Sequence, residues 1–180
     1  MSDVLERLAA LVREEGGLMA TLLDHRDDPD LMAAPAVTSP ALLAAEGPRT
    51  EGRREEYELL VEAIYEGYLL HYGYPRVVRP AEEDLRLLAG DRMYAIGLTL
   101  LVSLGDTAAV AELADTITLS ALAQGAGEKE LADAVWLAGA RAVGWGSSAA
   151  HRRAKDLTFA GSPEAIEAMR TSAVGSASAP

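Results

Sequence analysis

Four glutamates and a histidine share one stretch of the sequence, and their side chains could act as acids, bases or cation ligands. The acidic residues, three or four positions apart, are Glu55, Glu58, Glu62 and Glu66. If the stretch is helical, this spacing places them along one face, where like charges repel weakly. The simplest interpretation is a solvated face, ended by His71, whose cation suits the negative end of the helix dipole. The alternative is a ligand site built on this face.

A second candidate lies in the apolar stretch that follows, where Gly90 and Asp91 interrupt a helical pattern. Glycine costs a helix roughly 1 kcal/mol relative to alanine, and a buried carboxylate needs a partner. The pair therefore predicts close helix packing at Gly90 and a specific contact at Asp91, with a structural hydrogen bond preferred over catalysis. All six tyrosines also lie between residues 57 and 94. The predicted ligand-binding set is Glu62, Glu66, His71, Tyr72 and Asp91.

Other groupings of reactive side chains are better explained without chemistry. Asp24 and Asp28 have the spacing to chelate Mg²⁺ on one helix face, but they precede a proline-rich segment where solvated acids are ordinary. Ser147 and Ser148 lie near His151, and a helix surface explains them more simply than a nucleophile. The sequence has no glycine-rich phosphate loop with a lysine, no H-E-x-x-H and no Glu-x-x-His pair. We therefore predict no metal site and no cofactor.

The composition excludes further classes of function. The 180 residues include no cysteine, which removes disulfides, thiolate metal sites and a thiol nucleophile. Acidic residues number 28 against 16 basic, and the net charge of −12 disfavours nucleic acids and anionic membrane surfaces. The sequence shows neither a signal peptide nor the ~20 apolar residues of a membrane span. We expect a cytoplasmic protein with no membrane span.

The elements that would position these residues are helices. Hydrophobic residues make up 49% of the chain and aromatic ones only 5%, an aliphatic balance typical of packed helices. From Met93 to Leu104 the pattern is apolar on nearly all sides, so the helix over residues 85–104 is predicted to be the most buried of the fold. Helices are predicted over residues 4–12, 57–72, 80–104, 106–124, 128–146 and 162–172. Since no strand signal competes, the predicted fold class is an all-α helical bundle.

Prolines divide the chain into segments. Four of them fall between residues 29 and 48, and none lies between Pro80 and Pro163. This distribution indicates an irregular connection before a long helical region. The predicted organisation is an N-terminal helical segment over residues 1–28, a Pro/Ala-rich linker over 29–52, a helical core over 53–175 and a disordered tail over 176–180.

Two glycine–aspartate pairs stand out in the core, Leu87-Leu88-Ala89-Gly90-Asp91 and Leu104-Gly105-Asp106. They are followed in order by Leu122-Ala123-Gln124-Gly125, by Ala138-Gly139-Ala140 and by the segment from Ser162 to Glu167, which are similar to a glycine-marked turn and to two later helices of a known family. In this order and spacing, residues 55–176 resemble the polyprenyl synthetase family, the trans-isoprenyl diphosphate synthases. The resemblance implies a truncated isoprenoid synthase fold.

The catalytic motifs of that family are missing at the matching positions. The family binds diphosphates through Mg²⁺ held by two D-D-x-x-D motifs, and the first would lie at residues 69–75, which contain no aspartate. Arg76 and Arg79 are at most remnants of the family's arginine pair. Ionisation of an allylic diphosphate needs Mg²⁺ to stabilise the departing charge. The resemblance therefore implies the fold without the activity.

Two functions remain, beside a structural module of unrelated ancestry. The first is a non-catalytic subunit or pseudoenzyme that pairs with itself or with a catalytic prenyl synthase chain, or holds an apolar small molecule along Met93–Leu104. Residues 95–127 contain only three charges, which favours a homo-oligomer. The second is a small-molecule-binding protein or enzyme with a rebuilt Glu/His/Tyr site. A filled core would favour the first, and a deep apolar cavity with convergent Glu and His groups the second.

Overall fold

A computed structural model describes residues 3–23 and 39–174, and within these ranges the chain forms nine α-helices and no strand. The prediction of an all-α helical bundle is confirmed. Asp24, Asp28, the first part of the predicted linker and the predicted tail lie outside the described residues.

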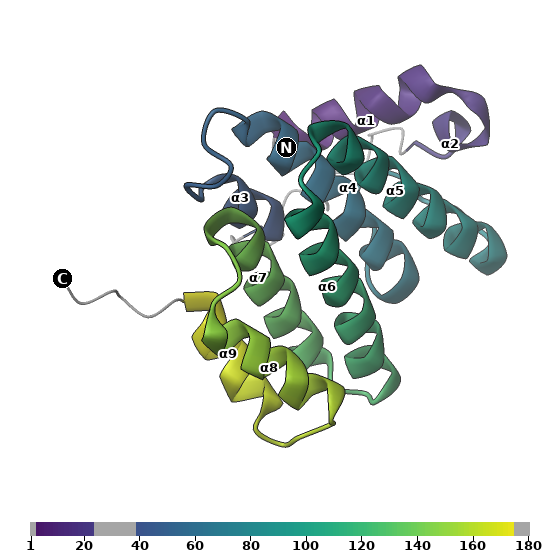
Figure 1. The fold of residues 1–180 in the computed structure, drawn as a ribbon. Helices are drawn as coiled ribbons and strands as arrows, with labels where there is room; N and C mark the ends of the chain where they lie inside the picture. The colour runs from purple at the N-terminus through teal and green to yellow at the C-terminus, as the bar shows by residue number, and fades with distance from the viewer. Residues whose placement is uncertain (1–2, 24–38, 175–180) are drawn as a thin grey trace.

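Three helical hairpins, α4–α5, α6–α7 and α8–α9, account for most of the structure (Figure 1). The helices in chain order are α1 (Asp3–Glu15), α2 (Gly17–Thr21), α3 (Pro40–Ala45), α4 (Arg54–Tyr72), α5 (Glu83–Leu104), α6 (Thr107–Gly125), α7 (Lys129–Trp145), α8 (Ala149–Phe159) and α9 (Ala165–Val174). Helix α1 packs on α4, and the short α3 packs on both α4 and α7. Helix α4 is therefore covered on several sides.

Helices α4 and α5 approach each other closely at glycines. A Cβ atom on Gly90 would lie 2.5 Å from His71 Nε2, and one on Gly97 would lie 2.4 Å from Ile64 Cγ1. Neither position can carry a side chain without a shift of the neighbouring helix. The close packing predicted at Gly90 is confirmed, and it explains why a residue that weakens helices stands there.

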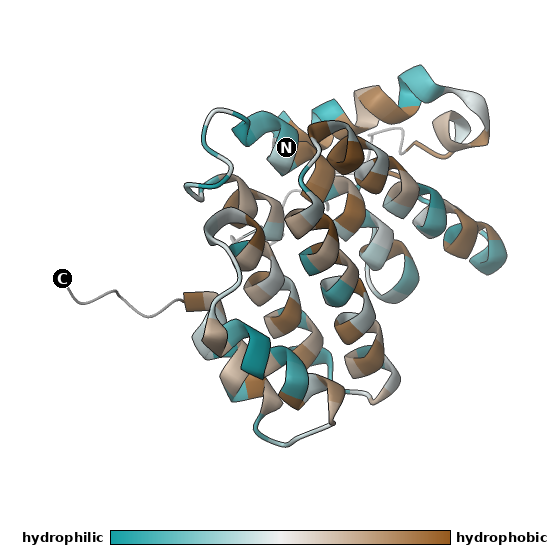
Figure 2. Cartoon of the chain, in the orientation of Figure 1, coloured by the Kyte–Doolittle hydropathy of each residue, from teal (hydrophilic) through white to brown (hydrophobic). Residues whose placement is uncertain are grey.

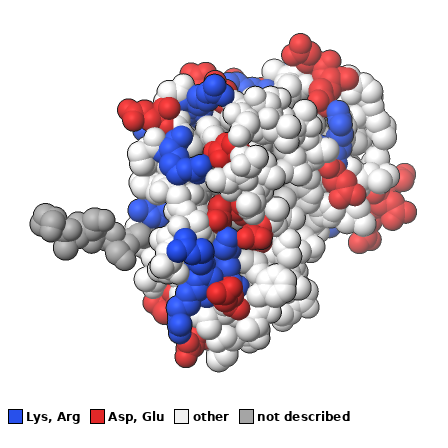
Figure 3. All heavy atoms as spheres, in the orientation of Figure 1, with Lys and Arg blue, Asp and Glu red and all other residues white. Residues whose placement is uncertain are grey.

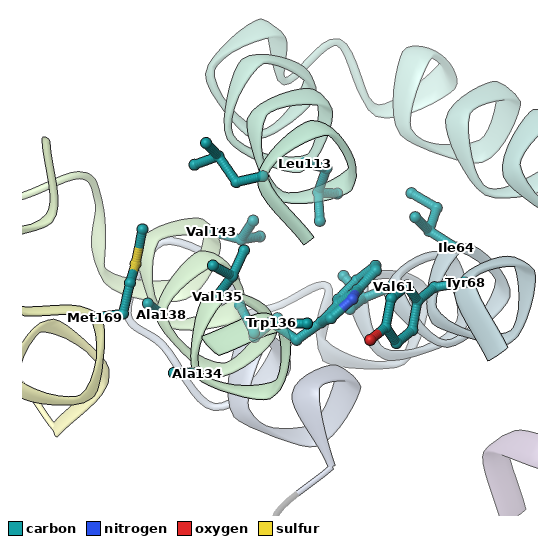
Figure 4. Close-up of a cluster of buried hydrophobic side chains, with 14 of the residues drawn as sticks. Val61, Ile64, Tyr68, Leu113, Ala134, Val135, Trp136, Ala138, Val143 and Met169 are labelled. Carbon is teal, nitrogen blue, oxygen red and sulfur yellow. The ribbon is translucent and has the colours of Figure 1, made fainter. Parts of the chain in front are cut away.

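The main core lies between α4, α6 and α7. Trp136 of α7 is 1% exposed and extends toward Tyr68 and Val61 of α4, as Figure 4 shows. Leu113 of α6 completes this cluster and is fully buried. Hydrophobic residues dominate α6 and α7, whereas α8 is mostly hydrophilic (Figure 2). Large side chains thus fill the space between the hairpins.

The prediction that residues 85–104 form the most buried helix is wrong. Helix α7 has eleven buried residues among seventeen, and α5 has six among twenty-two. The reason is that α5 packs one face on α4 and leaves Ala95, Thr99 and Val102 exposed on the other. Among the described helices, α5 alone has the length and apolar composition of a membrane span, a property that core helices of soluble proteins share.

Local signals gave some helix ends correctly and missed others. The Asp106 carboxylate accepts a hydrogen bond from Ala109 N–H at 3.0 Å, so its predicted capping role is confirmed. Helix α5 begins at Glu83 and not at Pro80. Helices α3 and α8 were not predicted, and α3 lies within the range expected to be a linker. Ser148 caps α8 by accepting from His151 N–H, which explains the Ser/His grouping structurally.

Candidate functional site

The glutamate face of α4 is solvated only in its first half. Glu55 and Glu58 lie beside Arg7 of α1, whose guanidinium is 3.2 Å from a Glu58 oxygen. Glu62 and Glu66, one and two turns further on, are 1% and 0% exposed. The prediction of one solvated face is therefore wrong for these two residues. The chain beyond α4 folds back over them, an event that helical spacing does not reveal.

Arg76 neutralises this buried pair of carboxylates. Its Nη2 donates to Glu62 Oε1, and its Nε donates to Glu66 Oε2 at 3.2 Å. Glu66 Oε1 accepts from the backbone N–H groups of Arg76 and Val77, the latter at 2.6 Å. Ser39 donates to the remaining oxygen of Glu62 at 3.3 Å. Every oxygen of the two carboxylates therefore has a hydrogen-bond partner within the chain.

Burial and charge act in opposite directions on this cluster. Burial raises the pKa of the Glu66 carboxyl, while Arg76 and the backbone donors lower it. The Arg76 guanidinium also lies 5.2 Å from the ring centre of Tyr65, within the range of a cation–π contact. Two carboxylates thus share one guanidinium, and the cluster is closed by hydrogen bonds.

The cluster fixes the segment between α4 and α5. Val77 and Val78, next to Arg76, are 4% and 0% exposed and contribute to the smaller core beneath α1. Val78 forms an isolated bridge with Leu23, which ties the N-terminal helices to this segment. The arrangement holds three separate parts of the chain together, and the charges of Glu62, Glu66 and Arg76 are paired with one another within it.

The other predicted site residues form a second group on a different side of α4. His71 follows Glu66 by five residues, which corresponds to about 140° around a helix. Its Nε2 lies 3.2 Å from Asp91 Oδ1, and its ring stacks on that of Tyr94 with centres 5.4 Å apart. The five predicted residues therefore do not converge on one point.

Asp91 is not the buried carboxylate that the sequence analysis expected. Its side chain is 70% exposed, although one oxygen lies near His71 of α4. Asp91 does contact His71 at an ion-pair distance, but among the described residues the buried His71 Nε2 has no hydrogen-bond partner, so the preferred structural hydrogen bond is not formed. Tyr72 is 44% exposed and lies near the rings of Tyr68 and His71. This group lies at the surface and carries one carboxylate.

A third cluster, absent from the sequence analysis, joins α6 with α8 and α9. His151 is 4% exposed, with Nε2 3.2 Å from Glu112 Oε2 and Nδ1 3.3 Å from Ser172 Oγ. Lys155 donates to Glu112 at 3.0 Å and to Asp115 at 2.7 Å. Burial raises the pKa of Glu112, but the hydrogen bonds from His151 and Lys155 outweigh it and lower the pKa to about 2. The partners lie 21 to 43 positions apart in the sequence, so no local spacing could have indicated them.

The order Ser172–His151–Glu112 has the residue types of a hydrolytic triad but not its accessibility. Ser172 is 8% exposed, and its hydroxyl donates to the Met169 carbonyl at 3.0 Å. A nucleophile must reach a substrate and give its proton to the base. Here the hydroxyl proton is directed to a backbone carbonyl instead. The cluster is a structural link between three helices.

Within residues 3–23 and 39–174, no group of three or more His, Cys, Asp or Glu side chains is arranged to hold a metal ion. Comparisons with protein-family models, with curated proteins and with solved structures find no match. The likeness to the polyprenyl synthetases therefore stays a prediction from the sequence.

Proposed function

We propose that this chain is a non-catalytic helical subunit or pseudoenzyme related to the prenyl diphosphate synthases. It acts by association, with copies of itself or with a catalytic synthase chain. The observation that carries the proposal is the closed state of the Glu62–Glu66–Arg76 cluster, in which hydrogen bonds within the chain occupy all four carboxylate oxygens.

The packing around α4 also supports a non-catalytic subunit. A binding or catalytic site would need a cavity with convergent polar groups. Instead, Trp136 of α7 is 1% exposed and packs on Tyr65 and Tyr68 of α4, with ring centres 5.0 and 5.2 Å away, so the space between these helices is filled. The acidic and histidine groups point to different sides of α4. A filled core favours a subunit over a small-molecule enzyme.

The segment that matches the family's first aspartate motif supports the absence of activity. Residues 69–72 form the last turn of α4, and Gly73 ends the helix. The imidazole of His71 and the hydroxyl of Tyr72 cannot replace the carboxylates that hold Mg²⁺ against a diphosphate. Without that cation, the departing diphosphate has too little charge stabilisation for prenyl transfer.

A surface on α5 and α6 with few charges supports association. Its exposed uncharged members are Ala95, Thr99, Val102, Ser103, Ala108, Ala111, Ala114, Thr118 and Leu122. Asp115 lies on the same face of α6 and is paired with Lys155. Val102 is 67% exposed and Leu122 is 48% exposed. Figure 3 shows a broad area without charges, bordered by acidic and basic side chains. On a chain with a net charge of −12, this is a surface where two copies can meet without opposing like charges.

A condensation assay tests the absence of activity. The purified chain is incubated with radiolabelled isopentenyl diphosphate, an allylic diphosphate and Mg²⁺, beside an active prenyl synthase as positive control. We expect product at background for the chain alone. When a catalytic synthase from the same organism is added, we expect co-purification and a changed product length.

Two results would contradict the proposal. Turnover by the chain alone would mean that a metal–diphosphate site has been overlooked. Weakened retention of a bound small molecule on His71→Ala or Asp91→Asn, with no effect on any synthase, would favour an independent ligand-binding protein.

A further inference from the structure

The surface formed by α5 and α6 exposes more apolar area than the packing of these helices within the chain accounts for. Helix α5 has the length and apolar composition to cross a membrane, yet only 33% of its apolar 18-residue stretch is buried. From Ala95 to Ser103 every exposed position is uncharged, and Val102 among them is 67% exposed. Leu122 of α6 is 48% exposed. Exposed apolar area of this kind marks a contact with a partner.

The charges near this α5–α6 surface are neutralised within the chain. Residues 92–127 contain four charged side chains, and each has an ion-pair partner. The pairs are Arg92–Glu15, Asp106–Arg49, Glu112–Lys155 and Asp115–Lys155. These four residues contribute −2 to the net charge of −12, so most of the acidic excess lies elsewhere in the chain. A strongly charged partner of either sign therefore gains little by binding here.

These features fit a second copy of the same chain. In a two-fold contact the same patch of surface meets itself, so any unpaired charge on the patch is opposed by its own kind. The acidic regions of this chain would repel one another in such a contact. The α5–α6 surface avoids that cost, because its exposed apolar residues are accompanied by charges that are already paired.

The net charge sets a condition on this contact. Two copies with a charge of −12 each repel at long range, even when the touching surfaces are neutral. The range of this repulsion falls from about 10 Å at 0.1 M salt to about 3 Å at 1 M. Burial of apolar surface continues to favour the contact at high salt.

We propose that the chain forms a two-fold homodimer through the α5–α6 surface and that ionic strength controls its formation. The chain is a monomer at low salt and a dimer near 1 M KCl. This dimer is one form of the association in the proposed function and rests on it.

Sedimentation velocity of the full chain in a KCl series tests the dimer. At low micromolar concentration we expect a monomer of 19.0 kDa at 0.1 M KCl and a dimer at 1 M. The dissociation constant should be at least about tenfold lower at 1 M. Val102→Asp places a charge on the surface and should keep the chain monomeric at 1 M KCl. Val174→Asp, the same change at an 80% exposed position of α9, should leave the dimer intact.

A variant away from the surface separates charge repulsion from the contact itself. Glu164→Gln combined with Glu167→Gln removes two exposed carboxylates next to or within α9, a helix that packs on α7 and α8. The dimer should become about two- to five-fold tighter at 0.1 M KCl and stay unchanged at 1 M, because only long-range repulsion is reduced. Circular dichroism spectra like that of the original chain check that each variant folds.

Several results would overturn this proposal. They are a monomer at every KCl concentration, a dimer equally tight at 0.1 and 1 M KCl, and a dimer that survives Val102→Asp. Co-sedimentation of monomers with phosphatidylcholine vesicles, lost in Val102→Asp, would assign the surface to a membrane instead. None of these results bears on the condensation assay. A monomer that binds a catalytic synthase at every salt concentration would overturn the dimer and leave the proposed function in place.

Discussion

Replacing Arg76 by methionine should destabilise the protein strongly at neutral pH. The change leaves Glu62 and Glu66, 1% and 0% exposed, without their shared cation. Glu66 keeps its two backbone donors, but Glu62 keeps only the hydroxyl of Ser39. Breaking one side of a buried ion pair costs about 3–5 kcal/mol. We expect a loss of this size in the free energy of unfolding, measured by urea titration with circular dichroism.

The pH dependence of this loss has a defined sign. Without Arg76, burial holds the pKa of the Glu66 carboxyl above its unfolded value, because the guanidinium that opposes this effect is gone. The folded state then binds more protons, so its stability is highest below the unfolded pKa and falls as pH rises through the folded pKa. The deficit of Arg76→Met should therefore shrink as pH falls from neutral toward the ordinary glutamate pKa of 4.5.

Two further variants test whether the cluster acts as a buried ion-pair network. The combined variant Glu62→Gln, Glu66→Gln, Arg76→Met removes all three charges and should regain most of the loss, because the uncompensated charges are gone. Arg92→Met removes the more exposed pair with Glu15, at 2.6 Å, and should cost at most about 1 kcal/mol. If Arg76→Met costs no more than Arg92→Met and its deficit is independent of pH, the cluster does not act as a buried ion-pair network.

Two other predictions concern the links between the hairpins. Because the pKa of Glu112 is lowered to about 2, its carboxylate stabilises the folded state above about pH 4.5, and this stabilisation is lost as pH falls toward 2. Glu112→Gln should lower the free energy of unfolding by about 3 kcal/mol at neutral pH and weaken its decrease at acidic pH. An unchanged decrease at acidic pH would contradict this. A Cβ atom on Gly139 would lie 2.0 Å from Thr116 Oγ1, whose hydroxyl donates to the Glu112 carbonyl. Gly139→Ala should therefore lower the free energy of unfolding by about 1–3 kcal/mol, and adding Thr116→Ala should restore part of this loss. Additive losses of the two variants in a denaturation experiment would argue against that contact.

The sequence predicted those features that depend on neighbouring residues. The all-α fold follows from apolar spacing, and the start of α6 follows from Asp106, because a cap bonds within its own first turn. Gly90 signalled close packing because glycine is unfavourable in a helix without such a reason. Each of these signals lies within one turn or one helix.

Features that depend on distant parts of the chain could not be predicted in the same way. The spacing of Glu62 and Glu66 predicted a solvated face, but in the structure Arg76, ten or more positions away, lies over both carboxylates. Glu112 and His151 are 39 positions apart, and nothing in their own surroundings marks them as partners. The reduced burial of α5 likewise depends on which helices cover it, and apolar composition alone does not give this.

Native mass spectrometry of the chain purified from its own host tests the central claim most directly, because it reports assembly and retained ligands together. The proposal of a non-catalytic subunit predicts a mass of at least twice 19.0 kDa, or a complex with a catalytic synthase chain, in either case without tightly held Mg²⁺ or diphosphate. A monomer of 19.0 kDa that retains a diphosphate or another polar ligand, and loses it on mutation of Glu62 or His71, would contradict the proposal.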